Sequence, residues 1–366
     1  MEITVNDICL ALEELAPLAL QENYDNAGLQ VGERQQPLSG VLLCVDVTEE
    51  IVQEAVEKNC NMIISHHPLI FNGIKSITGE NYVERTLRMS ILNDIAIYSS
   101  HTNLDISKRG VNQWIANKIG LKNIQPLTSV SNEQLKAVVF VPKSHEMLLR
   151  NAIFEVGAGQ IGDYDCCSFS STGIGTFRAS DACKPYVGKP DVLHCEEEIR
   201  MEIILQPHLK NKVLKAIYAV HPYEEPAIDF YSMQTGMAQN GVGALGELET
   251  PEDETQFLNR MKTLFRIPVI RHTEFLNKPI QKVALCGGSG SSFIRTVIAQ
   301  KADVFLSSDF KYHDFFSAEK KLIIADIGHF ESEECTKEIF FEQLSKKFPT
   351  FAVHFSNIST NPINYL

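Results

Sequence analysis

The sequence has no long apolar run, no basic N-terminal segment and no excess of positive charge. A transmembrane helix needs an apolar stretch of about 18 residues. A secretory signal peptide begins with positive charge, whereas this chain begins with acidic residues among apolar ones. Lys and Arg number 33 against 46 Asp and Glu, a net charge of −13. Because nucleic acids and anionic membranes attract positive surfaces, neither is an expected partner, and we expect a cytoplasmic protein.

The nine cysteines include no CxxC pair. An odd number of scattered cysteines is typical of free, mostly buried thiols in a reducing compartment. One group stands closer together than the rest: Cys166, Cys167, Cys183 and Cys195. Because a zinc site normally needs pairs spaced by about two to four residues, we expect packed free thiols here, with a zinc site as the alternative.

The 366 residues exceed one typical domain of about 100–200 residues and indicate two units. Apolar runs alternate with helical periodicity at both ends of the chain, which predicts parallel strands in an α/β fold. In the first part we expect strands at residues 41–47, 62–65 and 95–99 and helices at 7–20 (capped by Asn6), 49–58, 80–93 and 111–119. After residue 241 we expect strands at 283–286, 304–307, 322–326 and 351–355 and helices at 251–265, 291–300, 315–319 and 331–347.

The middle of the chain has a different pattern. Residues 125–132 form a polar linker, and residues 157–198 are rich in Gly, Ser, Cys and Pro, which indicates loops and short strands. Around them we expect strands at 135–141, 203–206 and 228–232 and helices at 144–156 and 209–220. Strand–helix–strand, twice over, indicates a small ferredoxin-like α+β unit. We therefore predict a discontinuous α/β body from residues 1–128 and 238–366, with residues 129–237 inserted.

Two adjacent histidines, His66 and His67, directly follow the strand expected at 62–65. Ligand sites of α/β sheets gather at the carboxyl ends of strands. Adjacent side chains diverge in a regular strand, so both reach one site only if the chain bends, which Pro68 favours. The alternative is one buried, hydrogen-bonded histidine and one solvated histidine.

A second polar segment, with His101 and Asp105, follows the strand expected at 95–99. We expect it at the same edge of the sheet. A hard carboxylate beside imidazoles suits a divalent metal ion. The alternative is an ordinary ion pair between Asp105 and Arg109, four residues later.

The third segment follows the strand expected at 322–326, where Gly328 allows a tight turn into a helix. His329 and Glu333 are four residues apart and share one helix face, so they can present two ligands to one ion. Acids in a first helical turn also complement the helix dipole, which explains Glu331 but not His329.

Besides His101, these segments supply three histidines, one aspartate and one glutamate at the ends of three strands. Five such ligands are too many for one ordinary catalytic zinc ion, which takes about three protein ligands. They suit two divalent cations that share a carboxylate. Bound cations would also give this acidic protein one site that attracts anions.

Seven motifs, in order over nearly the whole chain, make the sequence resemble the type 2 GTP cyclohydrolase I homologues, the NIF-three-like metal proteins. They are residues 24–32 (YDNAGLQVG), 65–68 (SHHP), 101–105 (HTNLD), 287–290 (GGSG), 308–314 (SDFKYHD), 328–333 (GHFESE) and 359–362 (STNP). Residues 221–226 (HPYEEP) resemble the signature of a PII/CutA-like domain inserted in longer members.

The resemblance implies a dinuclear site in a ring-shaped homohexamer. The implied ligands of two divalent ions per subunit are His66, His67, Asp105, His329 and Glu333. His101 matches a site-lining position and His313 a position beside the ligands or the substrate, so these two are the candidate catalytic residues. Nitrogen and oxygen ligands are compatible with Zn, Fe, Mn and Co alike. Glycines 287, 288 and 290 can admit a phosphate or simply form a solvated loop.

The resemblance implies GTP cyclohydrolase activity, in which metal-activated water attacks C8 of guanine and formate leaves. A small molecule, possibly a nucleotide, is then the substrate. Plain dinuclear hydrolysis of a phosphate or amide bond uses the same ligands. A non-catalytic metal-binding scaffold, with the insert as a regulatory or interaction module, is the alternative from another class.

Overall fold

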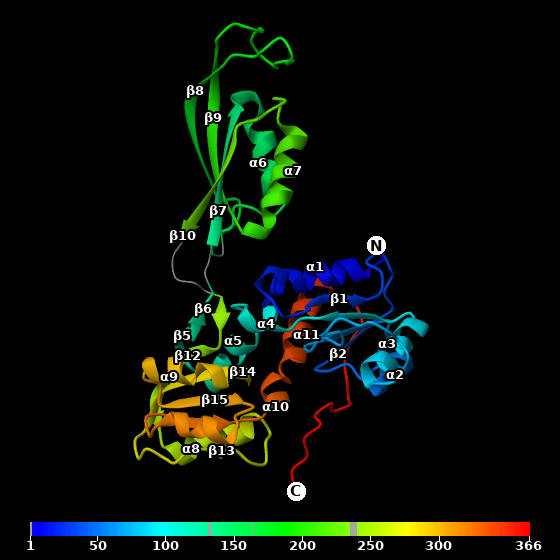
Figure 1. Cartoon of the computed structure of the whole chain (residues 1–366), viewed down its shortest axis with the longest axis vertical. Coiled ribbons are helices and arrows are strands. Elements are labelled where there is room, and N and C mark those ends of the chain that lie inside the picture. Colours follow the sequence, from blue (N-terminus) through cyan, green and yellow to red (C-terminus); the bar gives the residue numbers. More distant parts are fainter. Residues whose placement is uncertain (1, 131–132, 163, 235–239) are drawn as a thin grey trace. The chain divides into compact units, whose positions relative to one another are not determined.

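The structure is a computed structural model that describes residues 2–130, 133–162, 164–234 and 240–366. The chain divides into two compact units (Figure 1): Met1–Val130 with Ala238–Leu366, and Ser131–Met237. The predicted boundary at residues 237–238 and the last two residues of the predicted linker lie outside the described residues. No helix in the described part of the chain is long and apolar enough to cross a membrane.

The first unit contains a five-stranded sheet whose central strands are parallel, as predicted. Its order is β1 (Gly28–Val31), β4 (Ala96–Ser99), β3 (Met62–Ser65), β2 (Val41–Cys44) and β17 (Val353–Phe355). One face packs on α1 (Val5–Leu15) and α11 (Thr336–Lys347) and the other on α2 (Glu49–Glu57) and α3 (Tyr82–Leu92). Coverage on both faces explains why the strands are continuous apolar runs.

The same unit contains a six-stranded sheet. Its order is β13 (Arg271–His272), β16 (Ile323–Asp326), β15 (Val304–Ser308), β14 (Ile280–Ser289), β12 (Ala244–Glu252) and β5 (Lys122–Gln125). The three strands β14, β15 and β16 are parallel. One face packs on α5 (Val111–Ile119) and α8 (Glu254–Leu264) and the other on α9 (Ile294–Ala299). The short helices are α4 (Thr102–Ile106) and α10 (His329–Glu333), and β6 (Thr128–Ser129) pairs with β11 (Gly241–Val242).

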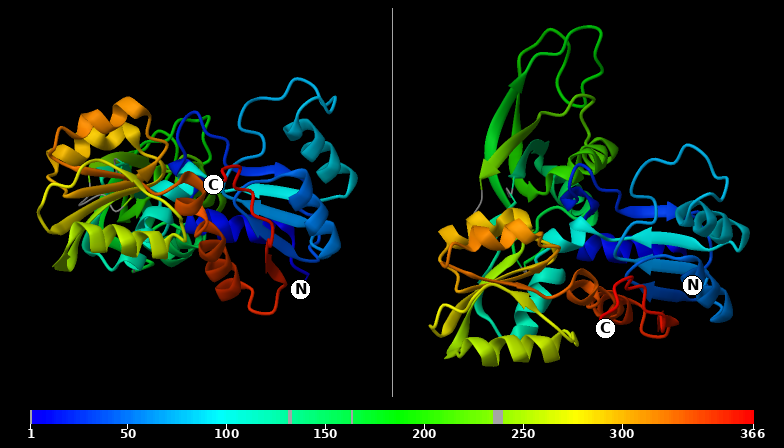
Figure 2. Two further views of the ribbon diagram at one scale, coloured as in Figure 1. Left: turned by 90° about the horizontal axis from the view of Figure 1, so that it is seen from below. Right: turned by 60° about the horizontal axis from the view of Figure 1, so that its bottom comes forward.

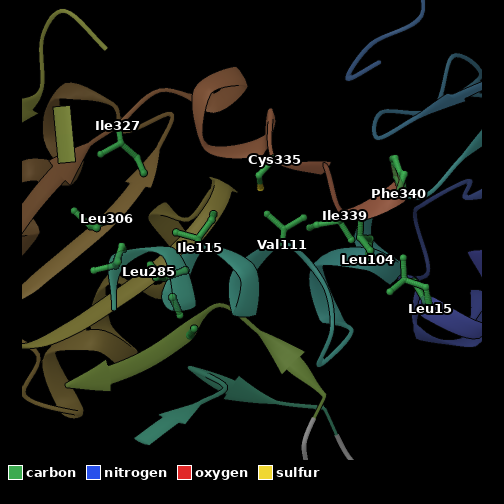
Figure 3. Close-up of a cluster of buried hydrophobic side chains, with 14 of the residues drawn as sticks. Leu15, Leu104, Val111, Ile115, Leu285, Leu306, Ile327, Cys335, Ile339 and Phe340 are labelled. Atoms are coloured by element: carbon green, nitrogen blue, oxygen red, sulfur yellow. The ribbon is translucent and has the colours of Figure 1, made fainter. Parts of the chain in front are cut away.

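One buried cluster joins the two sheets (Figure 3). Leu285 and Leu306 from the second sheet, Val111 and Ile115 from α5, and Ile339 from α11 all belong to it. The helix α11 also packs against β2 of the first sheet. Removing this apolar surface from water holds the two sheets as one body. Strand ends from both sheets are thereby fixed relative to each other.

The second unit is an antiparallel sheet with two helices on one face (Figure 1). Along the chain its elements are β7 (Glu133–Pro142), α6 (Glu146–Glu155), β8 (Ser168–Phe177), β9 (His194–Leu205), α7 (Lys210–Val220) and β10 (Ile228–Gln234). The sheet order is β10-β7-β9-β8. This is the β-α-β-β-α-β arrangement of a ferredoxin-like unit.

The structure differs from the sequence prediction at several elements. The first helix starts after Thr4, whose amide donates to Asp7 Oδ2 (2.9 Å), and it ends at Leu15 because Pro17 disfavours a helical preceding residue. The helix predicted over 331–347 is two helices, α10 and α11. The segment 315–319 lies within a 3-10 helix, Tyr312–Ala318.

The prediction of loops and short strands over residues 157–198 is wrong. Strands β8 and β9 pair continuously, from Ser168 opposite Ile203 to Phe177 opposite His194. Apart from Phe169, Ile174 and Phe177, the residues of β8 are Ser, Thr and Gly, and most are exposed, so its sequence has no apolar alternation to reveal a strand. For the same reason the short strand β6 lies in the segment that reads as a polar linker, residues 125–132, and β5 ends at the first residue of that segment.

Candidate metal centre

His66 and His67 lie at the carboxyl end of β3 and face the same site. The backbone amides of both donate to the carbonyl of Val45, at 3.1 and 2.9 Å, so the chain bends at this point. Their ring centroids are 4.9 Å apart. The alternative of one solvated histidine pointing away is therefore excluded, although His66 is fully buried and His67 is half-buried.

His101 directly precedes the short helix α4, and Asp105 lies within it. Both follow the strand β4, the neighbour of β3. Asp105 Oδ1 is 3.7 Å from His66 Nε2. The side chain of Asn103 fixes this turn, because it accepts from the amide of His101 (2.9 Å). Arg109 donates to Gln343 Oε1 (2.8 Å), so the ion pair with Asp105 is not needed to explain either residue. The prediction that the two segments share one sheet edge is confirmed.

His329 and Glu333 come from the second sheet, after β16, on α10. Gly328 has φ +80°, a conformation that favours glycine, and begins the helix. His329 Nε2 lies 3.1 Å from Glu333 Oε2, as the spacing of four residues predicts. The carboxylate rests against Gly288, where a Cβ would lie only 2.2 Å from Glu333 Oε1. That contact explains the glycine at position 288.

The GGSG segment does not offer free amides to a phosphate at its first two positions. The amide of Gly287 donates to Asn112 Oδ1 (2.9 Å), and the amide of Gly288 donates to Ser332 Oγ (3.0 Å). A Cβ at Gly290 would meet Ser307 Oγ at 2.2 Å. The glycines therefore allow close packing, at Gly288 against Glu333, at Gly287 against Val111 and at Gly290 against Ser307.

Glu333 is the point at which the three segments meet. Its Oε1 is 3.5 Å from His66 Nε2, and its Oε2 is 2.9 Å from His67 Nε2. Three groups of residues could each hold a metal ion, because the donor atoms within each group lie within 4.8 Å of one another. They are His66, His67 and His101; His67, His329 and Glu333; and His66, Asp105 and Glu333. All five predicted ligands and His101 therefore come together, from the ends of strands that belong to two different sheets.

Every histidine of the site has its Nδ1 atom occupied. The pairs are His66 with the carbonyl of Ser100 (2.9 Å), His67 with Asp46 Oδ1 (2.7 Å), His101 with Asp25 Oδ1 (2.7 Å) and His329 with Asp309 Oδ2 (2.7 Å). Each ring is thus oriented with Nε2 available. This is how proteins position histidine ligands, because the outer acceptor fixes the tautomer and raises ligand basicity.

The three orienting carboxylates escape sequence reasoning. Asp46 lies two residues after the strand β2, next to β3, so the rule for strand ends could have found it. Asp25 and Asp309 lie in loops, and no spacing links them to His101 and His329. Thr360, near the C-terminus, donates to Asp46 Oδ2 (2.6 Å), and the C-terminal segment runs past α10 (Figure 2).

The pKa values of the site residues are shifted by burial and by the close contacts among them. Burial raises the pKa of Asp105 to about 7. Burial works to lower the pKa of His67, but hydrogen bonds with Asp46 and Glu333 outweigh it and raise that pKa to about 10. In the same way Glu333 and Asp309 outweigh burial at His329 and raise its pKa to about 9. The pKa of Glu333 is held well below its usual range, because the charges and hydrogen bonds of the histidines outweigh its burial.

Three buried atoms of the site make no hydrogen bond of ordinary geometry among the described residues: His66 Nε2, Asp105 Oδ1 and Glu333 Oε2, although Glu333 Oε2 lies close to the rings of His67 and His329. Buried polar atoms without partners are rare in proteins and costly. All three are potential metal ligands, and they face one another. A cation among them would satisfy all three, so the residues present fit a bound metal ion.

His313 lies apart from these groups. It is exposed on the 3-10 helix after β15, and its ring packs against Tyr312 and Phe316. None of the three donor groups contains it.

The cysteine group differs from its predicted packing. Cys166, Cys183 and Cys195 are exposed and Cys167 is partly exposed, all as free thiols. The prediction of packed thiols is wrong here because the residues lie on or beside the exposed strands of the second unit. No possible metal group among the described residues contains a cysteine.

Comparison with known proteins agrees with this architecture. The chain matches the model of the Duf34/NIF3 (NGG1p interacting factor 3) family over residues 3–362. Proteins named GTP cyclohydrolase 1 type 2 homolog from Halalkalibacterium halodurans and Bacillus subtilis are 36% and 33% identical, and each alignment covers 97% of this chain and 96% of the relative.

Two solved structures extend the similarity to the fold. A Bacillus cereus protein related to NIF3 superimposes with a TM-score of 0.86 at 34% identity, with 100% of both chains covered. A Staphylococcus aureus protein superimposes with a TM-score of 0.77 at 30% identity, with 100% of this chain and 99% of the other covered. The chain therefore belongs to the Duf34/NIF3 family, with its mixed α/β fold of several sheets.

Proposed function

We propose that the first unit binds two divalent cations that share Glu333. Its carboxylate belongs to two donor groups, one with His67 and His329 and the other with His66 and Asp105. This sharing is the single observation that carries the proposal, since a carboxylate with two oxygens can join two ions. Nitrogen and oxygen donors suit Zn²⁺, Fe²⁺, Mn²⁺ or Co²⁺.

The inner part of the site, here called its floor, contains His66 and Glu333 and is buried. Its outer part, here called the rim, contains His329 and is accessible. The side chains of His66 and Glu333 are 0% and 4% exposed, whereas that of His329 is 33% exposed. A substrate can therefore approach from the side of His329 without unfolding the floor. Bound divalent cations would supply Lewis-acid activation of water there.

We infer that His101 moves protons at this rim. Its Nδ1 is held by Asp25, which leaves Nε2 directed toward the group that it forms with His66 and His67. A histidine so oriented can accept or donate a proton at Nε2. His313, exposed on the following 3-10 helix, is the second proposed catalytic residue, in contact with substrate rather than metal.

The proposed reaction is metal-dependent hydrolysis of a purine nucleotide, with GTP cyclohydrolase activity as its specific form. The names of the curated relatives support this choice. Two divalent cations bring four positive charges against two negative charges from Asp105 and Glu333, so the loaded site attracts an anion. Without metal, only the protons on His67 and His329 offset the carboxylates of the site, so it attracts an anion much less.

We further propose that the protein is a cytoplasmic homohexamer, in which the ferredoxin-like insert is a PII/CutA-like module that forms trimers. The resemblance of residues 221–226 to the signature of that module supports this assignment. Size measurement of the purified protein, with and without the insert, tests it.

The activity test uses metal-loaded protein, GTP and a panel of other nucleotides, with formate and phosphate release as readouts. Asp105→Ala should abolish turnover and keep the oligomer, because the carboxylate faces only the site. Glu334→Gln is the matched control, since Glu334 points away toward Lys337 (3.0 Å). No turnover by the loaded wild type would leave the non-catalytic scaffold as the function. GTP binding that survives removal of the metal by a chelator would contradict the electrostatic argument.

A further inference from the structure

The ferredoxin-like unit contains a pocket of about 420 Å³. This pocket shares no residue with the metal centre. It lies between β8, β9 and the segments that follow β8 and α7. Its size is in the range of about 300–1,000 Å³ that is typical of small-molecule sites. Four aromatic and three acidic residues are among those that line it: Phe140, Phe177, Tyr186, Tyr223, Glu198, Glu224 and Glu225.

A buried carboxylate lies in this pocket. Glu198 on β9 is 8% exposed, and no ion pair is found for it among the described residues. It fills the space left by Gly175 on β8, where a Cβ would lie 2.1 Å from Glu198 Oε2. A carboxylate removed from water without a cationic partner is unfavourable. Gly175 therefore makes room for the carboxylate of Glu198, which has no ion-pair partner among the described residues.

The aromatic walls of the pocket are held in place. Tyr223 lies with its ring centroid 6.0 Å from that of Phe177 and 6.3 Å from that of Tyr186. Its amide donates to His221 Nδ1 (3.1 Å), and His221 Nε2 donates to the carbonyl of Phe140 (2.9 Å). The buried Tyr223 hydroxyl lies beside Glu198, and burial together with that carboxylate raises the pKa of the hydroxyl. The HPYEEP segment thus positions a ring and a hydroxyl at this pocket.

The acidic residues also order the opposite wall. Glu224 Oε2 accepts from the amide of Lys184 (2.9 Å), which ties the segment that carries Tyr186 to the pocket. The side chains that line the pocket include no lysine, arginine or histidine. Negative charge and aromatic faces therefore meet without any internal cation.

We propose that this pocket binds an organic cation, such as a quaternary ammonium ion or a protonated amine. Cations are attracted to the faces of aromatic rings, and a buried carboxylate adds direct charge pairing. A bare divalent metal ion fits less well, because it requires several oxygen or nitrogen ligands close together, and no such group among the described residues includes Glu198, Glu224 or Glu225. The site does not depend on the function proposed for the metal centre.

Calorimetric titration of the full chain, in the presence of a metal chelator, tests the proposal with two cations, choline and agmatine. The neutral isostere 3,3-dimethyl-1-butanol has the shape of choline without its charge. We expect choline or agmatine to bind, and choline to bind at least tenfold more tightly than the isostere. Failure of both cations to bind, or equal affinity for choline and the isostere, would overturn the proposal.

Two variants locate the binding. Glu198→Gln should weaken binding at least tenfold, and it should fold because it replaces a buried charge with a neutral side chain of the same shape. Gly175→Ala should weaken binding similarly by displacing the carboxylate. Glu197→Gln is the matched control, because the adjacent Glu197 is exposed on the other face of the strand and carries the same charge. Equal loss in the Glu197 and Glu198 variants would show a general charge effect and contradict the site.

Discussion

The Nε2 atoms of His67 and His329 face each other at 3.3 Å, although 262 residues separate them in the chain. Glu333 Oε2 lies about as close to both. Each ring is locked from behind by a carboxylate, Asp46 or Asp309. The two Nε2 atoms are therefore positioned to bind one metal ion together. Because the histidines come from different sheets, the packing of the two sheets determines their distance.

Removing the shared carboxylate should empty the site. We predict that Glu333→Gln lowers bound metal from two ions per subunit to fewer than one, since both proposed ions lose a charged ligand. Elemental analysis of protein dialysed against a metal buffer measures this. Glu334→Gln should retain the full content, and a loss of metal equal to that of Glu333→Gln would mean that charge near α10, not ligation, controls binding.

Metal binding should release protons well above the pH expected for ordinary histidines. The metal-free site holds protons on His67 and His329 until the pH rises past about 9–10, because their pKa values are raised. Metal must displace these protons, so affinity rises as pH increases through 7–9, by about tenfold per unit for each proton. Below about pH 7 Asp105 is also protonated in the metal-free site, because its pKa is raised to about 7, so the metal must displace a third proton.

Calorimetry in buffers of different ionisation enthalpy counts these protons. We expect about two protons released per loaded subunit at pH 8 and more at pH 6. Ordinary histidine pKa values would place the loss of metal below about pH 6 instead. A binding constant that does not change between pH 6 and pH 9 would contradict ligation by these two histidines.

Orienting carboxylates should matter without touching the metal. We predict that Asp46→Asn weakens metal affinity by about 10–100-fold, because the ring of His67 loses its charged acceptor. Competition with a fluorescent chelator measures the affinity. Asp229→Asn, at an exposed position of the insert, removes the same charge and should leave affinity unchanged. Unchanged affinity in the Asp46 variant would show that His67 is held by its backbone alone.

Deleting the insert should separate the two proposed sites. The amide of Val130 donates to the carbonyl of Asn240 (3.1 Å), and β6 pairs with β11, so the chain can be closed from Ser129 to Asn240. We predict a folded protein that retains metal and loses choline binding. A soluble deletion protein without metal would show that the insert contributes ligands, with His221 the first residue to test.

The sequence predicts this site better than it predicts the fold around it. Histidines and acids at strand ends identify His66, His67, Asp105, His329 and Glu333, because strand ends and helical spacing are local properties. Which sheet a strand joins is not local, so the separation of β16 from β3 and β4 into another sheet is invisible until the chain is folded. The orienting residues Asp25 and Asp309 are missed for the same reason.

The most direct test is anomalous diffraction from crystals of the metal-loaded protein, recorded at the absorption edge of the bound metal. Two peaks in each subunit, separated by roughly 3.5–4 Å and both within bonding distance of Glu333, are the predicted result. One peak held by a single donor group would reduce the site to one ion. Peaks that lie away from His67, His329 and Glu333 would contradict the account.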